Sequence, residues 1–515
     1  MRPYPAILAL VCALLASRAG AEPTPEEVRV AQYYDVKSLP LPPGIDPEIG
    51  GLNAMPNGDL VATFHHGEVA FYSPSKRQWR IFAEGLHEPL GVLPEPGGGL
   101  LVMQRPELTR LRDTKGTGVA DSYETVWDGF GMSGNYHEFA FGPVRGPNGK
   151  LYVALNLASN GAPVREEIRG RWIDIGLPRR AFYEGDWDSH ADAAGRMYSR
   201  VPYRGWVVEI DEATGAATPF ACGFRSPDGI GFDPAGHLIV NDNQGDWRGT
   251  NEFHYVVRDG FYGHPASLVW RRDWDGSEPL KVPIARLDSM RTVPAIEIPY
   301  ESYSMSATGF ALIPKSPAWG PLGGQLICGE MNFPRLIRLL PEEVDGLWQG
   351  ACLFLADTAA LKLGSHRLTF IGDTLYVGHI HLSWVGAEGI TTLTPTGKTP
   401  FDVVEMRITH QGFRFAFTRP LLSADSDPAR WTARRYFYAY HAVYGSPEME
   451  STSVQPSRVA LGSGRTCADV EYPQLEPGWI YDFDLSRIQS AEGKLLLNQK
   501  IAYTVNRVPR AAVSP

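Results

Sequence analysis

Cysteine is scarce in this chain, with five residues among 515, and no two of them form a C-x-x-C pair. The absence of C-x-x-C-H excludes covalently attached haem, and the absence of C-x-x-C excludes a zinc knuckle of that type. Four cysteines follow residue 21 and are widely spaced: Cys222, Cys328, Cys352 and Cys467. One or two disulfides and buried free thiols are both compatible with this spacing.

The N-terminus lacks an apolar run long enough to span a membrane. Residues 5–16 are apolar but too short, Arg2 precedes them, and the small residues Ala19-Gly20-Ala21 follow. This pattern predicts a signal peptide over residues 1–21 and therefore a periplasmic or secreted protein.

Basic residues are too few to balance the acidic ones. Lys and Arg together number 48 against 58 Asp and Glu, for a net charge of −10. An acidic exported chain has no electrostatic reason to bind nucleic acid or anionic lipid. We therefore expect a small-molecule substrate as the partner.

Turn-forming residues, by contrast, are abundant, with 54 Gly and 42 Pro. An alternating apolar strand, a turn and a second strand recur six times, at starts about 40 to 90 residues apart. The copies lie within residues 52–61, 90–102, 139–153, 229–240, 309–327 and 368–377.

One such hairpin cannot bury both of its faces, but a ring of hairpins can. We therefore predict an all-β chain whose residues 30–400 form a six-bladed β-propeller. A β-sandwich or an open repeat array is the alternative.

The pattern changes after residue 400 to short, aromatic-rich strands between Ser, Asp and Pro loops. This change predicts a small β-sandwich over residues 401–510.

The third hairpin carries the residues on which a family resemblance depends. It reads Gly-Asn-Tyr-His-Glu-Phe-Ala-Phe-Gly-Pro over 134–143, with Lys-Leu-Tyr at 150–152. This segment resembles the soluble, calcium- and quinone-dependent glucose and sorbosone dehydrogenases. It is closer still to the propeller modules of the exported "membrane-bound dehydrogenase" proteins of Planctomycetes and Verrucomicrobia. Those often continue into a cytochrome c domain. This sequence has no such motif, so we expect a separate electron acceptor.

The resemblance implies that His137 is a general base, which takes a proton from a sugar hydroxyl while hydride passes to pyrroloquinoline quinone. An imidazole suits this task because its pKa lies near working pH. The family orients this base with an acid at the end of the outgoing strand. Here Asn156 stands near that place, and an amide cannot stabilise an imidazolium as a carboxylate does. A capping role for His137 is the alternative.

The resemblance also implies a cofactor site. Arg225, before Ser226-Pro227, matches an arginine directed at the carboxylates of the quinone, and Asn251 and Arg367 are further candidates. The family's lysine in the fifth blade and one of its two arginines in the sixth are missing. The pocket is therefore suited either to a weakened quinone site or to a less charged ligand.

A metal ion completes the implied site. The family's Gln-Gly turn offers backbone carbonyl groups to Ca²⁺, and Gln244-Gly245-Asp246 matches it. Gly245 and Asp246 are thus the predicted calcium ligands.

Three functions remain open from the sequence. The first is an exported sugar or aldose oxidoreductase that uses pyrroloquinoline quinone and Ca²⁺. The second is a propeller carbohydrate lyase or hydrolase with a metal-assisted site. The third is a carbohydrate-binding propeller without catalysis.

Overall fold

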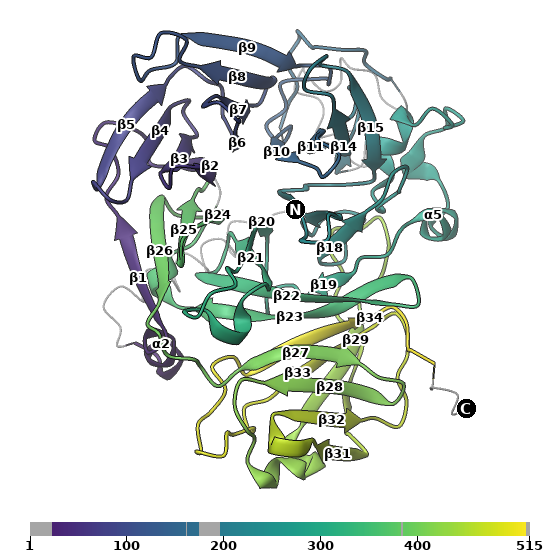
Figure 1. The fold of residues 1–515 in the computed structure, drawn as a ribbon. Coiled ribbons are helices and arrows are strands. Elements are labelled where there is room, and N and C mark those ends of the chain that lie inside the picture. The colour runs from purple at the N-terminus through teal and green to yellow at the C-terminus, as the bar shows by residue number, and fades with distance from the viewer. Residues whose placement is uncertain (1–22, 161, 175–195, 383–384, 511–515) are drawn as a thin grey trace.

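The computed structural model describes residues 23–160, 162–174, 196–382 and 385–510, and strands dominate them (Figure 1). The α-helices in these ranges are short: α2 (Pro25–Ala31) and α5 (Ile284–Met290). The all-β prediction is confirmed. The predicted signal peptide lies outside the described residues. Among the residues described, no helix is both long and apolar enough to cross a bilayer.

The chain up to residue 395 builds six groups of four antiparallel strands within the described ranges, here called units 1 to 6. Units 1 to 3 are β2 (Ile49–Ala54), β3 (Leu60–Phe64), β4 (Val69–Ser73) and β5 (Gln78–Ala83); β6 (Gly91–Pro94), β7 (Leu100–Met103), β8 (Leu108–Arg112) and β9 (Ser122–Trp127); β10 (Ala140–Arg145), β11 (Leu151–Leu155), β14 (Trp206–Ile210) and β15 (Ala217–Cys222). Units 4 to 6 are β16 (Gly229–Phe232), β17 (Leu238–Asp242), β18 (Asn251–Val256) and β19 (Ile296–Ile298); β20 (Ala307–Leu312), β21 (Leu326–Glu330), β22 (Arg335–Val344) and β23 (Leu347–Asp357); β24 (Ser365–Ile371), β25 (Thr374–His379), β26 (Gly389–Pro395) and β1 (Tyr34–Leu39).

The units close into a ring. The first strand of each unit contacts the first strand of the next, and β24 of unit 6 contacts β2 of unit 1. These strands surround the centre of the ring in Figure 1. The N-terminal strand β1 completes unit 6 by pairing with β26, so that Tyr34 lies opposite Pro395. The six hairpins found in the sequence are the first two strands of the six units.

Glycine permits the close approach of neighbouring first strands. A Cβ atom on Gly91 of β6 would lie 1.7 Å from the carbonyl oxygen of Gly142 in β10. One on Gly229 of β16 would lie 2.4 Å from the carbonyl oxygen of Thr308 in β20. Any side chain at either position would push two units apart.

The C-terminal part is joined to unit 5 by backbone hydrogen bonds. Strand β23 pairs with β34, with Gly350 opposite Thr504, so unit 5 extends into an eight-stranded sheet. The added strands are β34 (Lys500–Val505), β33 (Trp479–Asp484), β29 (Thr432–Phe437) and β30 (Met449–Val454). A second sheet contains β27 (Val403–Ile408), β28 (Gly412–Phe417), β32 (Cys467–Glu471) and β31 (Arg458–Leu461).

Aromatic side chains fill the space between these two sheets. Their buried core includes Phe413, Phe415, Trp431, Tyr481 and Tyr503. The aromatic stripes seen in the sequence are therefore core residues. The boundary at residue 400 and the separate sandwich stay predictions, since one sheet continues from unit 5.

A buried ion pair lies where the units meet. Arg367 Nη1 donates to Asp228 Oδ1 at 2.9 Å, and His366 Nε2 lies 3.0 Å from the same oxygen. Arg367 Nε also donates to the carbonyl of Leu90 at 3.1 Å, and its guanidinium carbon lies 5.1 Å from the Phe141 ring centre. Units 2, 3, 4 and 6 are thus linked through one guanidinium. Asp228 and Arg367 also line a cavity of about 310 Å³ between the first strands.

We expect Arg367→Met to lower the free energy of unfolding by about 3–5 kcal/mol, because it leaves the buried Asp228 carboxylate without its strongest partner. Urea unfolding followed by circular dichroism measures the change. Arg258→Met is the matched control, since Arg258 pairs with Glu209 at the surface and such pairs contribute about 0–1 kcal/mol. Equal losses in the two variants would contradict this account.

Candidate functional site

The predicted site residues can be placed by strand direction. In each unit the second strand runs antiparallel to the first, so the segments before the first and after the second share one end. We call it the strand-start end of the ring. It carries His137 before β10, Arg225 before β16 and the Gln244-Gly245-Asp246 turn after β17. These three predicted features therefore share one end of the ring.

Local hydrogen bonds fix His137. Its backbone N–H donates to Asn135 Oδ1 at 3.0 Å, and its Nδ1 lies 2.6 Å from Ser159 Oγ. The Tyr136 ring packs edge-on against the imidazole, with ring centres 5.0 Å apart. No group within the described ranges hydrogen-bonds its Nε2.

Ser159, and not Asn156, is the side chain that orients His137. Asn156 Nδ2 donates to Ser226 Oγ at 2.9 Å, which directs the amide toward unit 4. Ser159 lies three residues further on, in β12 (Ala158–Ser159), which pairs with β13 (Met197–Tyr198). The partner predicted from the end of the outgoing strand was therefore wrong, because the chain continues into this extra strand pair.

Burial and positive charge keep His137 neutral. Burial, together with the guanidinium charges of Arg225, Arg196 and Arg105, lowers the pKa of His137 to about 4. Both effects disfavour the imidazolium. The ring is therefore a neutral imidazole at pH 7.

Arg225 packs against the predicted calcium turn. A Cβ on Gly245 would lie 1.8 Å from Arg225 Nε, and Arg225 Nε is 3.7 Å from Asp246 Oδ1. The Tyr444 ring from the C-terminal part lies 5.4 Å from the Arg225 guanidinium carbon. The arginine predicted to bind a carboxylate ligand is therefore next to a carboxylate of the chain.

The two predicted calcium ligands already have partners. The Gly245 carbonyl accepts from the backbone N–H of Gly445 at 2.8 Å. Asp246 Oδ2 accepts from the backbone N–H of Met197 at 3.0 Å and lies 3.0 Å from His264 Nε2. Burial by itself would raise the pKa of Asp246, but His264 and Arg225 hold it below its usual range.

The other predicted cofactor ligands have hydrogen-bond partners within the fold. Asn251 is fully buried; its Nδ2 donates to the carbonyl of Ser304 at 3.0 Å, and its Oδ1 accepts from Gln244 N–H at 3.0 Å. Arg367 bonds Asp228 and the Leu90 carbonyl, as described above. Both residues were predicted to contact a cofactor, but in the structure their hydrogen bonds are to other parts of the chain.

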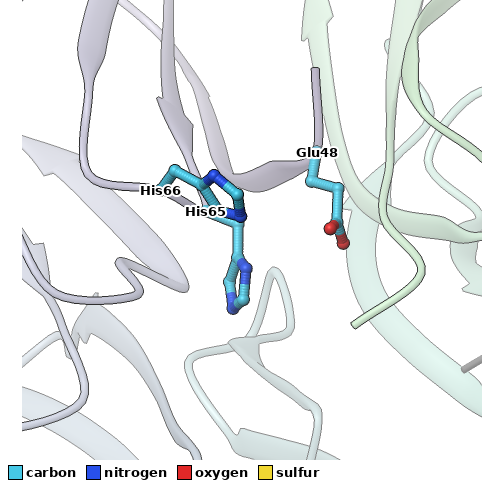
Figure 2. Close-up of side chains that lie close together, drawn as sticks. All are labelled: Glu48, His65 and His66. Carbon is cyan, nitrogen blue, oxygen red and sulfur yellow. The ribbon is translucent and has the colours of Figure 1, made fainter. Parts of the chain in front are cut away.

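The strand-start end also carries a cluster that the sequence analysis missed. Glu48 precedes β2, and His65 and His66 follow β3 directly. One ligand atom from each of the three residues lies within 4.8 Å of the others. Figure 2 shows the two imidazoles beside the Glu48 carboxylate. The His-His dipeptide after a predicted strand was the available signal, but Glu48 lies on a different segment.

Comparisons with known proteins place the chain only loosely. A family model described as a domain of unknown function, DUF7133, matches residues 77–200. No curated protein matches the sequence.

Several solved structures are similar at low identity. The PQQ-bound aldose sugar dehydrogenase of Streptomyces coelicolor is 14% identical, with a TM-score of 0.45, covering 70% of this chain and 98% of that one. A putative glucose dehydrogenase of Thermus thermophilus is 18% identical, with a TM-score of 0.45, covering 70% and 99%. The apo aldose sugar dehydrogenase of Escherichia coli is 14% identical, with a TM-score of 0.43, covering 70% and 99%. At such low identities and TM-scores, no residue role is transferred from these structures to this chain.

The residues present do not fit the expected quinone and calcium pair. Asn251 and Arg367 are bound within the fold, and the Gly245 carbonyl has a hydrogen-bond donor. A Ca²⁺ ion at Asp246 would also lie beside the Arg225 guanidinium, which repels it. Binding there requires Arg225 to move away from the turn.

We therefore expect millimolar Ca²⁺ to leave the melting temperature of the wild-type chain unchanged. An ion that binds the folded state alone would raise it by mass action. Differential scanning fluorimetry with CaCl₂, and with MgCl₂ as the control salt, measures this. A saturable, Ca²⁺-specific rise that Asp246→Asn abolishes would contradict the expectation and restore the turn as a calcium site.

Proposed function

We propose that the chain is a six-bladed propeller oxidoreductase that oxidises a sugar hydroxyl at the strand-start end, with His137 as general base. In this proposal units 1 to 6 are the blades and residues 401–510 are a sandwich attached to the fifth blade. The predicted signal peptide supports action in the periplasm or outside the cell. Tyr444 reaches Arg225 from the C-terminal part, which gives that part a role in shaping the site.

The placement of His137 carries the proposal: it stands at the strand-start end, its Nδ1 lies 2.6 Å from Ser159 Oγ, and no described residue hydrogen-bonds its Nε2. In the tautomer whose Nδ1–H donates to Ser159 Oγ, Nε2 holds the lone pair that accepts a proton. A base must be unprotonated to act, and the lowered pKa of about 4 keeps His137 unprotonated at neutral pH, although it also makes the ring a weaker proton acceptor than an ordinary imidazole. A histidine that only capped a strand would not need an Nε2 that the described part of the chain leaves unbonded.

Positive charge around His137 supports the same role. A hydroxyl that loses its proton develops negative charge on oxygen, and fixed cations stabilise that charge. Arg105, Arg196 and Arg225 all act electrostatically on His137. Of the three arginines, only Arg225 was predicted from the sequence as a site residue. Arg105 comes from unit 2, and Arg196 from the insertion between β11 and β14.

Oxidation of an alcohol to a carbonyl releases one proton and one hydride. His137 accounts for the proton. A quinone supplies the hydride acceptor where one is bound, but the residues predicted to hold it do not fit. The hydride therefore needs a two-electron acceptor that Asn251 and Arg367 do not hold; the family resemblance gives this acceptor as a quinone, and its electrons would pass on to a separate acceptor.

We expect His137→Ala to lower kcat/KM by about 10²–10⁴-fold, the usual contribution of a general base. The assay is dye reduction by a panel of aldoses, with and without added quinone and Ca²⁺. His237→Ala is the control, because His237 is an exposed partner of Asp233 on the β16–β17 turn, at the opposite end of unit 4. Hydrolysis or elimination without dye reduction would overturn the proposal in favour of the lyase or hydrolase alternative.

The pH profile gives a separate prediction. Because His137 has a lowered pKa of about 4, kcat/KM is retained from neutral pH down to about 5 and falls below about 4. Arg225→Met removes a charge that lowers this pKa, so its acidic limb moves to higher pH. An acidic limb near pH 6.5 in the wild-type chain would contradict the assignment.

A further inference from the structure

We propose that Glu48, His65 and His66 form a binding site for a divalent transition-metal ion of the zinc type. This metal site is independent of the quinone and calcium expectations and of the proposed oxidation. It lies at the same strand-start end as His137 but on unit 1.

The backbone holds two of the ligands in place. The backbone N–H of His65 donates to the carbonyl of Glu48 at 2.9 Å, which fixes the start of β2 beside the end of β3. Gly67 closes the turn after the two histidines with φ of +117°, and a Cβ there would lie 2.3 Å from the carbonyl of Leu86. The His-His turn is therefore packed closely against the segment that connects units 1 and 2.

The Glu48 carboxylate is oriented before any ion binds. Its Oε2 accepts from the backbone N–H groups of His381 at 3.1 Å and Leu382 at 2.8 Å. Its Oε1 lies 3.2 Å from His381 Nε2. Only 6% of this side chain is exposed. Such outer hydrogen bonds commonly fix a metal-binding carboxylate and raise its affinity for the ion.

His65 is a mostly buried imidazole, 14% exposed, whose ring nitrogens the described residues leave unsatisfied. Both of its ring nitrogens are buried, and neither has a hydrogen-bond partner in the ranges the structure covers. The nearest carboxylate, Glu88 Oε2, is 3.9 Å from Nε2 and bonds Arg105. A buried polar atom without a partner is unfavourable. A metal ion beside Glu48 would give His65 the missing interaction.

His66 completes the set from the solvent side. Its side chain is 59% exposed, so the ring can turn, and Asp46 Oδ2 lies 3.6 Å from its Nδ1. Ligand atoms around a tetrahedral zinc ion are about 3.3 Å apart, from bond lengths of about 2.0 Å. The present separations of up to 4.8 Å would have to shorten on binding, and the exposed His66 ring is the ligand that can turn toward the other two.

The ligand types decide the class of ion. Two imidazoles and one carboxylate suit Zn²⁺ or Fe²⁺, whereas Ca²⁺ and Mg²⁺ prefer oxygen ligands alone. Three protein ligands leave a coordination position open, which is typical of sites where an ion binds or activates an oxygen ligand. The local charge also favours a cation, because three carboxylates surround the cluster (Asp46, Glu48 and Glu88) and only one arginine, Arg105, is nearby.

A short chain of hydrogen bonds links this cluster to the His137 region. Tyr136, adjacent to His137, donates its hydroxyl to the carbonyl of Leu382, and the N–H of Leu382 binds Glu48. The metal and the base therefore belong to one end of the ring.

Calorimetry on the untagged, chelator-treated full chain tests the site with Zn²⁺ alone. We expect one Zn²⁺ per chain, and His66→Ala and Glu48→Gln should each weaken binding by more than about 100-fold, since even loss of an outer partner costs 10–100-fold. His66 and Glu48 are chosen because a buried His65→Ala change risks the fold. Melting temperatures without metal show whether the variants remain folded.

His410→Ala is the matched control, because His410 is an exposed histidine on the turn between β27 and β28, and it should bind Zn²⁺ like the wild-type chain. Absence of Zn²⁺ binding by the wild-type chain would overturn the site. So would wild-type affinity for Zn²⁺ in His66→Ala and Glu48→Gln variants that remain folded. The measurement needs no substrate, so its outcome is separate from that of the His137→Ala assay.

Discussion

The buried contact between Arg367 and Asp228 is the constraint on which the ring depends. One guanidinium bonds the carboxylate before β16 and the carbonyl before β6, while His366 lies against the same carboxylate. The bonds span 139 and 277 residues of sequence. A guanidinium can do this because its several donors point in fixed directions. Burial excludes water, which makes the loss of either charged partner costly.

The chemistry of the strand-start end follows from that closure. Closing the ring brings the segments before every first strand to one side, so groups from different units face a common opening. His137 is kept neutral there by burial and by arginines from units 2 and 4 and from the insertion. The Glu48, His65 and His66 cluster lies at the same end. A base that stays neutral and an oxygen-binding metal are compatible, since a neutral imidazole does not repel the ion.

The C-terminal part changes the site that the family resemblance implies. The backbone N–H of its Gly445 donates a hydrogen bond to the Gly245 carbonyl, and its Tyr444 ring lies beside Arg225. These contacts use the groups that the resemblance assigned to calcium and quinone. The continuous sheet from β23 to β34 holds this part against the ring.

The sequence by itself determined the six hairpins and the position of His137 at the entrance of a first strand, because alternation and turn residues act over a few neighbouring positions. Only the tertiary structure decided which polar and charged groups were free to bind a cofactor or a metal ion. Arg367 was expected to bind a cofactor, but its partner Asp228 is 139 residues away. Gly245 was expected to bind calcium, but Gly445 covers it from another sheet. Local pattern predicts strand direction, whereas the partners of a buried polar group depend on which distant segments the closed ring brings together.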